Sequence, residues 1–111
     1  MANPPDTSAR GAARTYVGIH DDEYGGMTFL GGIVKDGWIF GFIPETESCA
    51  GWTYAALEAL SSKVRDAWGR YGYRVDALPP DIREHHTRIH AAAIERARAL
   101  GWDPELSDEE E

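Results

Sequence analysis

The clearest signal in this sequence is the apolar stretch MTFLGGIVKDGWIFGFIP, residues 27–44, in which two apolar runs flank Asp36-Gly37. An Asp-Gly pair readily adopts the positive φ angles that a two-residue type I′ turn requires. The flanking runs are rich in the branched and aromatic residues that favour strands. The stretch therefore predicts a β-hairpin, and Pro44 would end its second strand because proline has no amide hydrogen for a sheet.

Both faces of this predicted hairpin are apolar. Strand alternation would place Trp38, Phe40 and Phe42 on one face, with Ile39 and Ile43 on the other. Helices would cover one face, and a second copy of the chain would supply a cover for the other. We therefore expect Trp38, Phe40 and Phe42 to form an interface, either in a homodimer or with a different protein.

Two helices are predicted after the hairpin. In the first, apolar residues recur at spacings of three and four between residues 57 and 71, and Thr53 is a suitable N-cap. The second runs from the proline pair at residues 79–80, which suits a first helical turn, to Gly101, which suits a stop.

These elements predict a small α+β domain. The segment TYVGIH, residues 15–20, alternates as a short strand, and YRVDAL, residues 73–78, is either a short edge strand or a connector. The strand and the hairpin would form a small antiparallel sheet with the two helices packed on one face. This single domain would span residues 15–104, between a flexible leader at 1–14 and an acidic disordered tail at 105–111.

The charge and composition narrow the classes of partner. The formal net charge is −8, whereas phosphate binding needs clustered Lys and Arg, so we expect neither duplex nucleic acid nor an anionic membrane as a partner. The start of the chain lacks the apolar core of a secretory signal, and no apolar run approaches the roughly 20 residues of a membrane span. A single cysteine, Cys49, cannot form an internal disulfide. These features predict a cytoplasmic protein.

Three of the 4 histidines lie within residues 85–90, on the second predicted helix. On a helical wheel His86 and His90 lie at the edge of the apolar stripe, whereas His85 lies on the opposite flank. Two histidines at this spacing project from the same side of a helix, which is a recurrent way to present two imidazoles to one metal ion. The residues between them do not form the HExxH motif of zinc proteases.

The segment HDDE, residues 20–23, is the second group of ligand-type side chains. If His20 and Asp22, or the adjacent Asp21 or Glu23, completed the histidine pair, the site would suit Zn, Mn or Fe. Two other interpretations of the pair stay open. The imidazoles would be structural groups with hydrogen-bond partners, or a pH-responsive pair whose protonation is costly on an apolar face.

Catalytic motifs are scarce. Cys49 precedes the first predicted helix, where a helix N-terminus lowers the pKa of a thiol, but Glu45 and Glu47 lie close in sequence and oppose a thiolate. The chain has no CxxC motif and no glycine-rich nucleotide motif. A partly buried cysteine without a catalytic role is the simpler interpretation.

Two hypotheses of function follow. The first is a small acidic cytosolic protein with a binding or regulatory role, homodimeric and non-catalytic, with a protein partner or a second copy. The second is a metal-binding protein, or a metal-dependent hydrolase or oxygenase, that uses His86 and His90 with His20 and Asp22. The sequence leaves open whether the chain is an enzyme.

Overall fold

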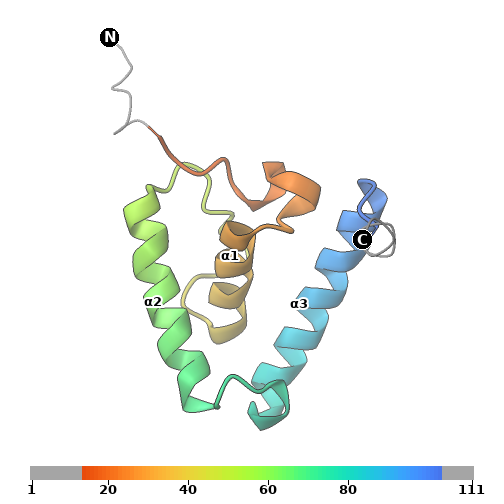
Figure 1. Ribbon diagram of the computed structural model, residues 1–111. Helices are drawn as coiled ribbons and strands as arrows, with labels where there is room; N and C mark the ends of the chain where they lie inside the picture. Colours follow the sequence, from red (N-terminus) through yellow and green to blue (C-terminus); the bar gives the residue numbers. More distant parts are fainter. Residues whose placement is uncertain (1–13, 104–111) are drawn as a thin grey trace, which may run out of the picture.

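The computed structural model describes residues 14–103, and every regular element in this range is a helix. Three α-helices form the fold (Figure 1): α1 (Phe29–Phe40), α2 (Tyr54–Arg70) and α3 (Pro80–Ala99). Three short 3-10 helices accompany them: η1 (Ile19–Asp21), η2 (Glu23–Gly25) and η3 (Val75–Ala77). Within these residues no sheet forms, and an isolated β-bridge joins Thr15 to Thr53. The predicted α+β fold is therefore wrong.

The hairpin predicted at residues 27–44 is replaced by helix α1. Its buried residues lie on more than one side of the helix, because both α2 and α3 pack on it; they are Gly31, Ile33, Val34, Lys35, Gly37, Trp38 and Ile39. The Asp36-Gly37 pair, which was predicted to form the hairpin turn, lies inside the helix. An apolar run without a polar face does not distinguish a strand from a helix that is buried on several sides. The elements that cover this segment therefore decide its structure.

Two local signals set the ends of α1. The Thr28 side chain accepts a hydrogen bond from the amide of Gly31 at 3.0 Å, which satisfies one of the free donors of the first turn. At the other end Gly41 adopts a φ of 78°, in the left-handed region that favours glycine, and the helix stops there. Thr28 and Gly41 are the signals that the hairpin interpretation overlooked.

The two short predicted strands are also absent. In the segment at residues 15–20, Tyr16 and Ile19 are buried while Val17 is 58% exposed, so the side chains do not alternate as predicted. Ile19 begins η1. The segment at residues 73–78 is a connector that contains η3, and Tyr73 lies in it with a φ of 60°.

Both helices predicted after the hairpin are confirmed as α2 and α3. Thr53 caps α2 through a hydrogen bond from the amide of Ala56 at 3.1 Å. Pro80 is the first residue of α3, where its missing amide hydrogen costs nothing. Beyond α3, Gly101 adopts a φ of 102°, and the amide of Trp102 donates to the carbonyl of Ala97 at 3.0 Å. Caps within a few residues of each end explain why these helices were predictable.

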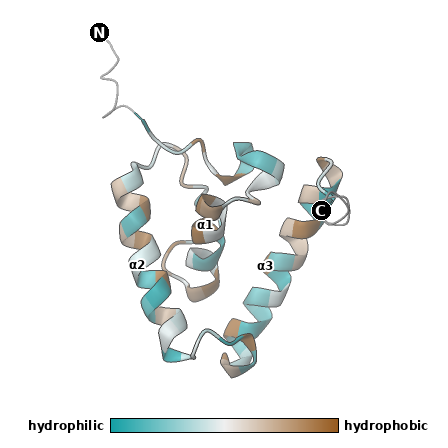
Figure 2. Ribbon diagram, in the orientation of Figure 1, coloured by the Kyte–Doolittle hydropathy of each residue, from teal (hydrophilic) through white to brown (hydrophobic). Residues whose placement is uncertain are grey.

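Helix α1 packs against both α2 and α3, which lie on either side of it (Figure 1). Its ribbon is hydrophobic over most of its length apart from one hydrophilic turn, whereas α2 and α3 alternate between the two (Figure 2). The core joins residues of all three helices to residues of the segments before α1 and α2. Its main cluster consists of Tyr16, Ile19, Val34, Trp38, Ile39, Cys49, Leu57 and Ile89.

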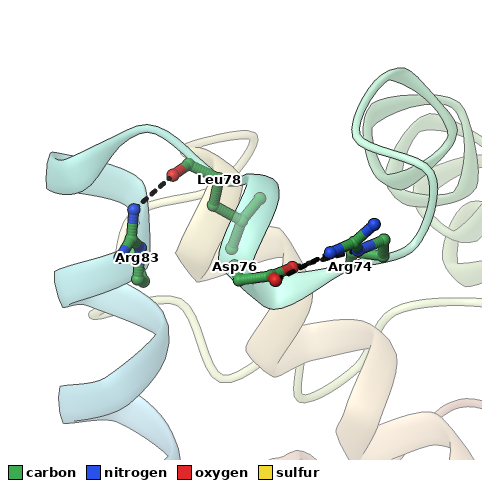
Figure 3. A network of polar contacts seen from close by, with 4 residues as sticks. All are labelled: Arg74, Asp76, Leu78 and Arg83. Atoms are coloured by element: carbon green, nitrogen blue, oxygen red, sulfur yellow. Dashed lines mark hydrogen bonds and ion pairs between the residues drawn. The ribbon is translucent and has the colours of Figure 1, made fainter.

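The connection from α2 to α3 is stabilised by polar contacts (Figure 3). The guanidinium of Arg74 donates two hydrogen bonds to the carboxylate of Asp76, at 3.1 and 2.8 Å. Arg83, in the first turns of α3, reaches back to donate to the carbonyl of Leu78 at 3.2 Å. Leu78 itself is 2% exposed, so its side chain anchors the connection in the core.

The expectations about the chain ends lie outside the described residues, except for Arg14 at the end of the predicted leader. Within residues 14–103 no helix is both long enough and apolar enough to cross a membrane.

The adjacent glycines of α1 provide a test of its packing. A Cβ atom at position 31 would overlap the backbone of Gly26, whereas one at position 32 would meet nothing within 4 Å. We expect Gly31→Ala to lower the free energy of unfolding by about 2 kcal/mol or more. Gly32→Ala should raise it by about 0.5–1 kcal/mol, because alanine favours a helix.

Urea denaturation followed by far-ultraviolet circular dichroism would measure both variants. Equal effects of the two substitutions would contradict the position of α1 against Gly26.

Candidate functional site

The carboxylate of Asp22 ties the N-terminal segment to the start of α1. One oxygen accepts hydrogen bonds from the Tyr16 hydroxyl, at 2.7 Å, and from the Thr28 hydroxyl. The other oxygen accepts from the amide of Glu23 at 2.7 Å. Thr28 also caps α1. Asp22, which was predicted as a metal ligand, therefore accepts three hydrogen bonds from within the fold.

The charge of Asp22 is stabilised by these donors. Burial alone would raise the pKa of Asp22, but hydrogen bonds from Thr28, Tyr16 and the Glu23 amide hold it below its ordinary value. Burial, and next the hydrogen bond to Asp22, raise the pKa of Tyr16. At neutral pH the pair is therefore an ionised carboxylate with a neutral phenol.

His20 lies beside Asp22, at the far end of α3 from His86 and His90. It is exposed, and it lines an open hollow with Asp22, Glu23, Tyr24 and Leu100. Leu100 follows the last residue of α3, about 15 Å along the helix axis beyond position 90 at 1.5 Å per residue.

The histidine pair lies where the three helices meet. The ring centroids of His86 and His90 are 4.3 Å apart. The ring of His86 also meets Trp68 of α2 edge to face, with centroids 6.0 Å apart. Trp68 donates a hydrogen bond from Nε1 to Oδ2 of Asp36, on α1, at 3.3 Å. We call Asp36, Trp68, His86 and His90 the Asp36 joint, because it links α1, α2 and α3.

Burial and positive charge keep His90 neutral. Burial lowers the pKa of His90, and His86 and Lys35 lower it further. Lys35, on α1, is only 6% exposed, and burial is the main cause that lowers its own pKa. Burial raises the pKa of Asp36, although the Trp68 hydrogen bond and the charges of His86 and Lys35 act in the opposite direction. Burial, with the charges of His86 and Lys35, therefore disfavours a proton on His90.

The four predicted metal ligands do not come together. His86 and His90 are adjacent, but His20 lies at the other end of α3 and Asp22 is hydrogen-bonded within the fold. Within residues 14–103, no group of three or more His, Cys, Asp or Glu side chains is placed to hold a metal ion. The pair supplies two ligands, so a metal there would need the rest from elsewhere.

Cys49 is a core residue. Its side chain is 0% exposed, and its amide donates to the carboxylate of Glu47 at 2.9 Å. Burial, together with the charge of Glu47, raises the pKa of the Cys49 thiol to about 11. A thiol that stays protonated at neutral pH is a poor nucleophile.

The residues predicted to share an interface differ in exposure, because they lie on a helix and its C-terminal loop instead of a strand, although the rings of Phe40 and Phe42 lie 6.3 Å apart. Trp38 is 9% exposed and donates from Nε1 to the carbonyl of Glu47 at 2.9 Å. Phe40 packs edge to face on Trp68, with centroids 5.2 Å apart. Phe42 is 40% exposed. The three side chains therefore do not form one exposed face.

A groove beside the first turns of α1 and α2 was missed by the sequence interpretation. Its volume is about 300 Å³, and its walls are Phe29, Leu30 and Ile33 from α1 and Tyr54, Leu57, Glu58, Ser61 and Arg65 from α2. Phe29 is 79% exposed and Tyr54 is 49% exposed. With α1 recognised as a helix, the spacing of positions 29, 30 and 33 would have indicated this wall.

Comparisons with protein-family models, curated protein sequences and solved structures give no match to this chain. The function is therefore argued from the geometry alone.

The role of Asp22 can be tested by truncation. We expect Asp22→Ala to lower the free energy of unfolding by about 2–4 kcal/mol, because Tyr16 and Thr28 lose a charged acceptor. Asp21→Ala is the control, since Asp21 is exposed and should change stability by no more than about 0.5 kcal/mol. Urea denaturation measures both. Equal losses in the two variants would contradict the structural role.

The lowered pKa of His90 predicts how the free energy of unfolding depends on pH. The pKa of His90 is lowered from 6.5, so on acidification the unfolded chain gains a proton before the folded chain does. Stability should therefore fall as the pH drops below about 6.5. Asp36, whose pKa is raised from 3.8, contributes with the opposite sign, so a His90 variant is needed to isolate the effect.

His90→Gln should flatten this loss of stability between about pH 8 and pH 5, the range in which histidine titrates. The matched control is His85→Gln, because His85 is exposed on the same helix. Thermal denaturation across this range provides the measurement. An unchanged pH profile in His90→Gln would show that the lowered pKa of His90 does not control stability.

Proposed function

We propose that this chain is a small, acidic, cytoplasmic protein with a non-catalytic binding or regulatory role, which associates with a second copy of itself through the α1–α2 groove. The observation that carries the proposal is the exposure of Phe29, at 79%, on the wall of an apolar groove. Aromatic side chains beside a pocket are the typical anchors of protein interfaces. The groove takes the place of the interface predicted from strand alternation.

The free energy gained by burying exposed aromatic rings favours a groove that is filled by a partner. Removing a phenylalanine side chain from water contributes about 1.5–3 kcal/mol. Leu30, Ile33 and Leu57 supply apolar wall beside it, and the half-exposed ring of Tyr54 lies at the same mouth. Two aromatic rings at one groove offer more apolar contact than isolated exposed side chains elsewhere on the surface.

The side chains that could take part in catalysis are held in contacts within the fold, which supports a non-catalytic role. Asp22 is engaged in three hydrogen bonds, the thiol of Cys49 is buried and protonated, and His86 and His90 pack against each other at the helix junction. These groups contribute to the fold, whereas the exposed aromatic residues of the groove do not.

Self-association through Phe29 is directly testable. We expect sedimentation equilibrium to show a dimer for the full chain, and Phe29→Ser to weaken the dimer at least about tenfold, as the loss of an interface anchor does. Leu100→Ser is the control, because Leu100 is 56% exposed just after the last residue of α3 and does not line the groove. A monomeric wild type, or equal effects of the two variants, would overturn the proposal.

A further inference from the structure

One side of α2 carries a stripe that lines the groove. Tyr54, Glu58, Ser61 and Arg65 all line it, and at about 100° per residue they fall within roughly 60° of one another on the helix. The core residues Leu57, Leu60 and Val64 occupy a different side. Ser61 is only 7% exposed, so the accessible part of the stripe consists of Tyr54, Glu58 and Arg65, on a side of α2 that the core residues do not occupy.

The stripe has one charge of each sign, and neither is neutralised by the other. Glu58 and Arg65 are both exposed, and they are two helical turns, or about 10 Å, apart. The ion pairs Arg74–Asp76 and Arg88–Glu45 involve neither residue. Arg65 donates to the hydroxyls of Ser61 at 3.0 Å and Ser62 at 3.5 Å, which holds its guanidinium along α2 with further donors free for an acceptor.

We propose that two copies pair their α2 helices antiparallel about a two-fold axis that passes beside Ser61 and Ser62, so that Glu58 of each copy meets Arg65 of the other. This inference rests on the self-association proposed above and specifies its geometry. A two-fold axis between positions 61 and 62 places the two charges of one stripe opposite the two complementary charges of the second stripe. Such reciprocal pairing is what charge complementarity in an isologous interface requires.

Side-chain size fits the same axis. Ser62 is small and exposed, and the Ser61 side chain is buried within its own chain, so the helices can approach to the roughly 8–10 Å of packed helices. The rotation that pairs Glu58 with Arg65 also places Tyr54 opposite Gly69 of the second copy. Around Gly69 the space is open, since an added Cβ atom would meet only the Tyr73 hydroxyl, at 3.9 Å. The ring of Tyr54 therefore has a place to pack, with Phe29 beside it on the same groove.

Charge also selects the direction of pairing. In a parallel arrangement Glu58 would face Glu58 and Arg65 would face Arg65, and like charges in contact disfavour association. The other nearby candidate for the groove is the segment before residue 14, because Thr15 bridges to Thr53 next to Tyr54. That segment, MANPPDTSARGAA, offers Met1 as its single large apolar side chain. It is a poorer match to an apolar groove than a second copy.

The decisive experiment exchanges the charges in the full chain. In Glu58→Arg, each copy would present Arg at position 58 to Arg65 of the other, and in Arg65→Glu each would present Glu to Glu58. We expect each variant alone to dimerise at least about tenfold more weakly than the wild type, because two attractive pairs become repulsive. An equimolar mixture should form a heterodimer of near wild-type affinity, because both cross-pairs become opposite in sign.

Native mass spectrometry and sedimentation equilibrium would distinguish homodimers from the heterodimer. The matched controls are Glu95→Arg on α3 and Lys63→Glu on the side of α2 away from the stripe, which make the same charge changes at exposed positions. Both controls should dimerise as the wild type does. Thermal denaturation of each variant identifies any loss of association that is only a loss of folding.

The outcomes separate this inference from the function on which it rests. If Phe29→Ser disrupts the dimer while the charge variants associate normally, self-association stands and antiparallel α2 pairing is overturned. The same conclusion follows if the mixture fails to restore association. If the wild type is a monomer, because the N-terminal segment or nothing fills the groove, both proposals fail.

Discussion

The burial of α1 between α2 and α3 is the constraint on which the other contacts rest. Both outer helices pack on α1, and Trp68 meets His86 where they approach each other. Close packing requires small residues, and a Cβ atom at Gly31 would overlap the backbone of Gly26. The start of α1 is fixed by Thr28, whose hydroxyl caps the helix and also donates to Asp22. One polar residue therefore aligns the N-terminal segment with the helix that the core surrounds.

Burial of α1 has an electrostatic consequence, because its middle carries Lys35 and Asp36. Removal from water disfavours both charged forms, which lowers the pKa of Lys35 and raises that of Asp36. Asp36 nevertheless gains a donor from α2, through Trp68. The same positive charge of Lys35 acts on His90 from α1 and disfavours its protonation. Lys35 and Asp36 lie in one turn of α1. This turn therefore links the contact between α1 and α2 to the protonation of His90 on α3.

The groove beside α1 and α2 uses a side of α2 that differs from the side packed in the core. The core uses one side of α2, while the stripe of Tyr54, Glu58 and Arg65 lies on another side along the groove. Phe29 is exposed because it is the first residue of α1, before the helix is covered on both sides. Substitutions of the exposed residues Tyr54, Glu58 and Arg65 should therefore have little effect on the core, so the proposed association can be tested independently of stability.

Short-range signals were sufficient for α2 and α3, because the Thr53 cap, Pro80 and Gly101 act within a few residues of each helix end. The i, i+4 spacing likewise placed His86 beside His90. Residues 27–44 were misassigned because a segment that is apolar on every side has no amphipathic period, and its environment outweighed the turn preference of Asp-Gly. Only tertiary packing decided that α1 is a helix, that Asp22 binds Tyr16 and Thr28, and that a groove opens beside Phe29. Each of these depends on contacts between side chains that no local sequence pattern indicates.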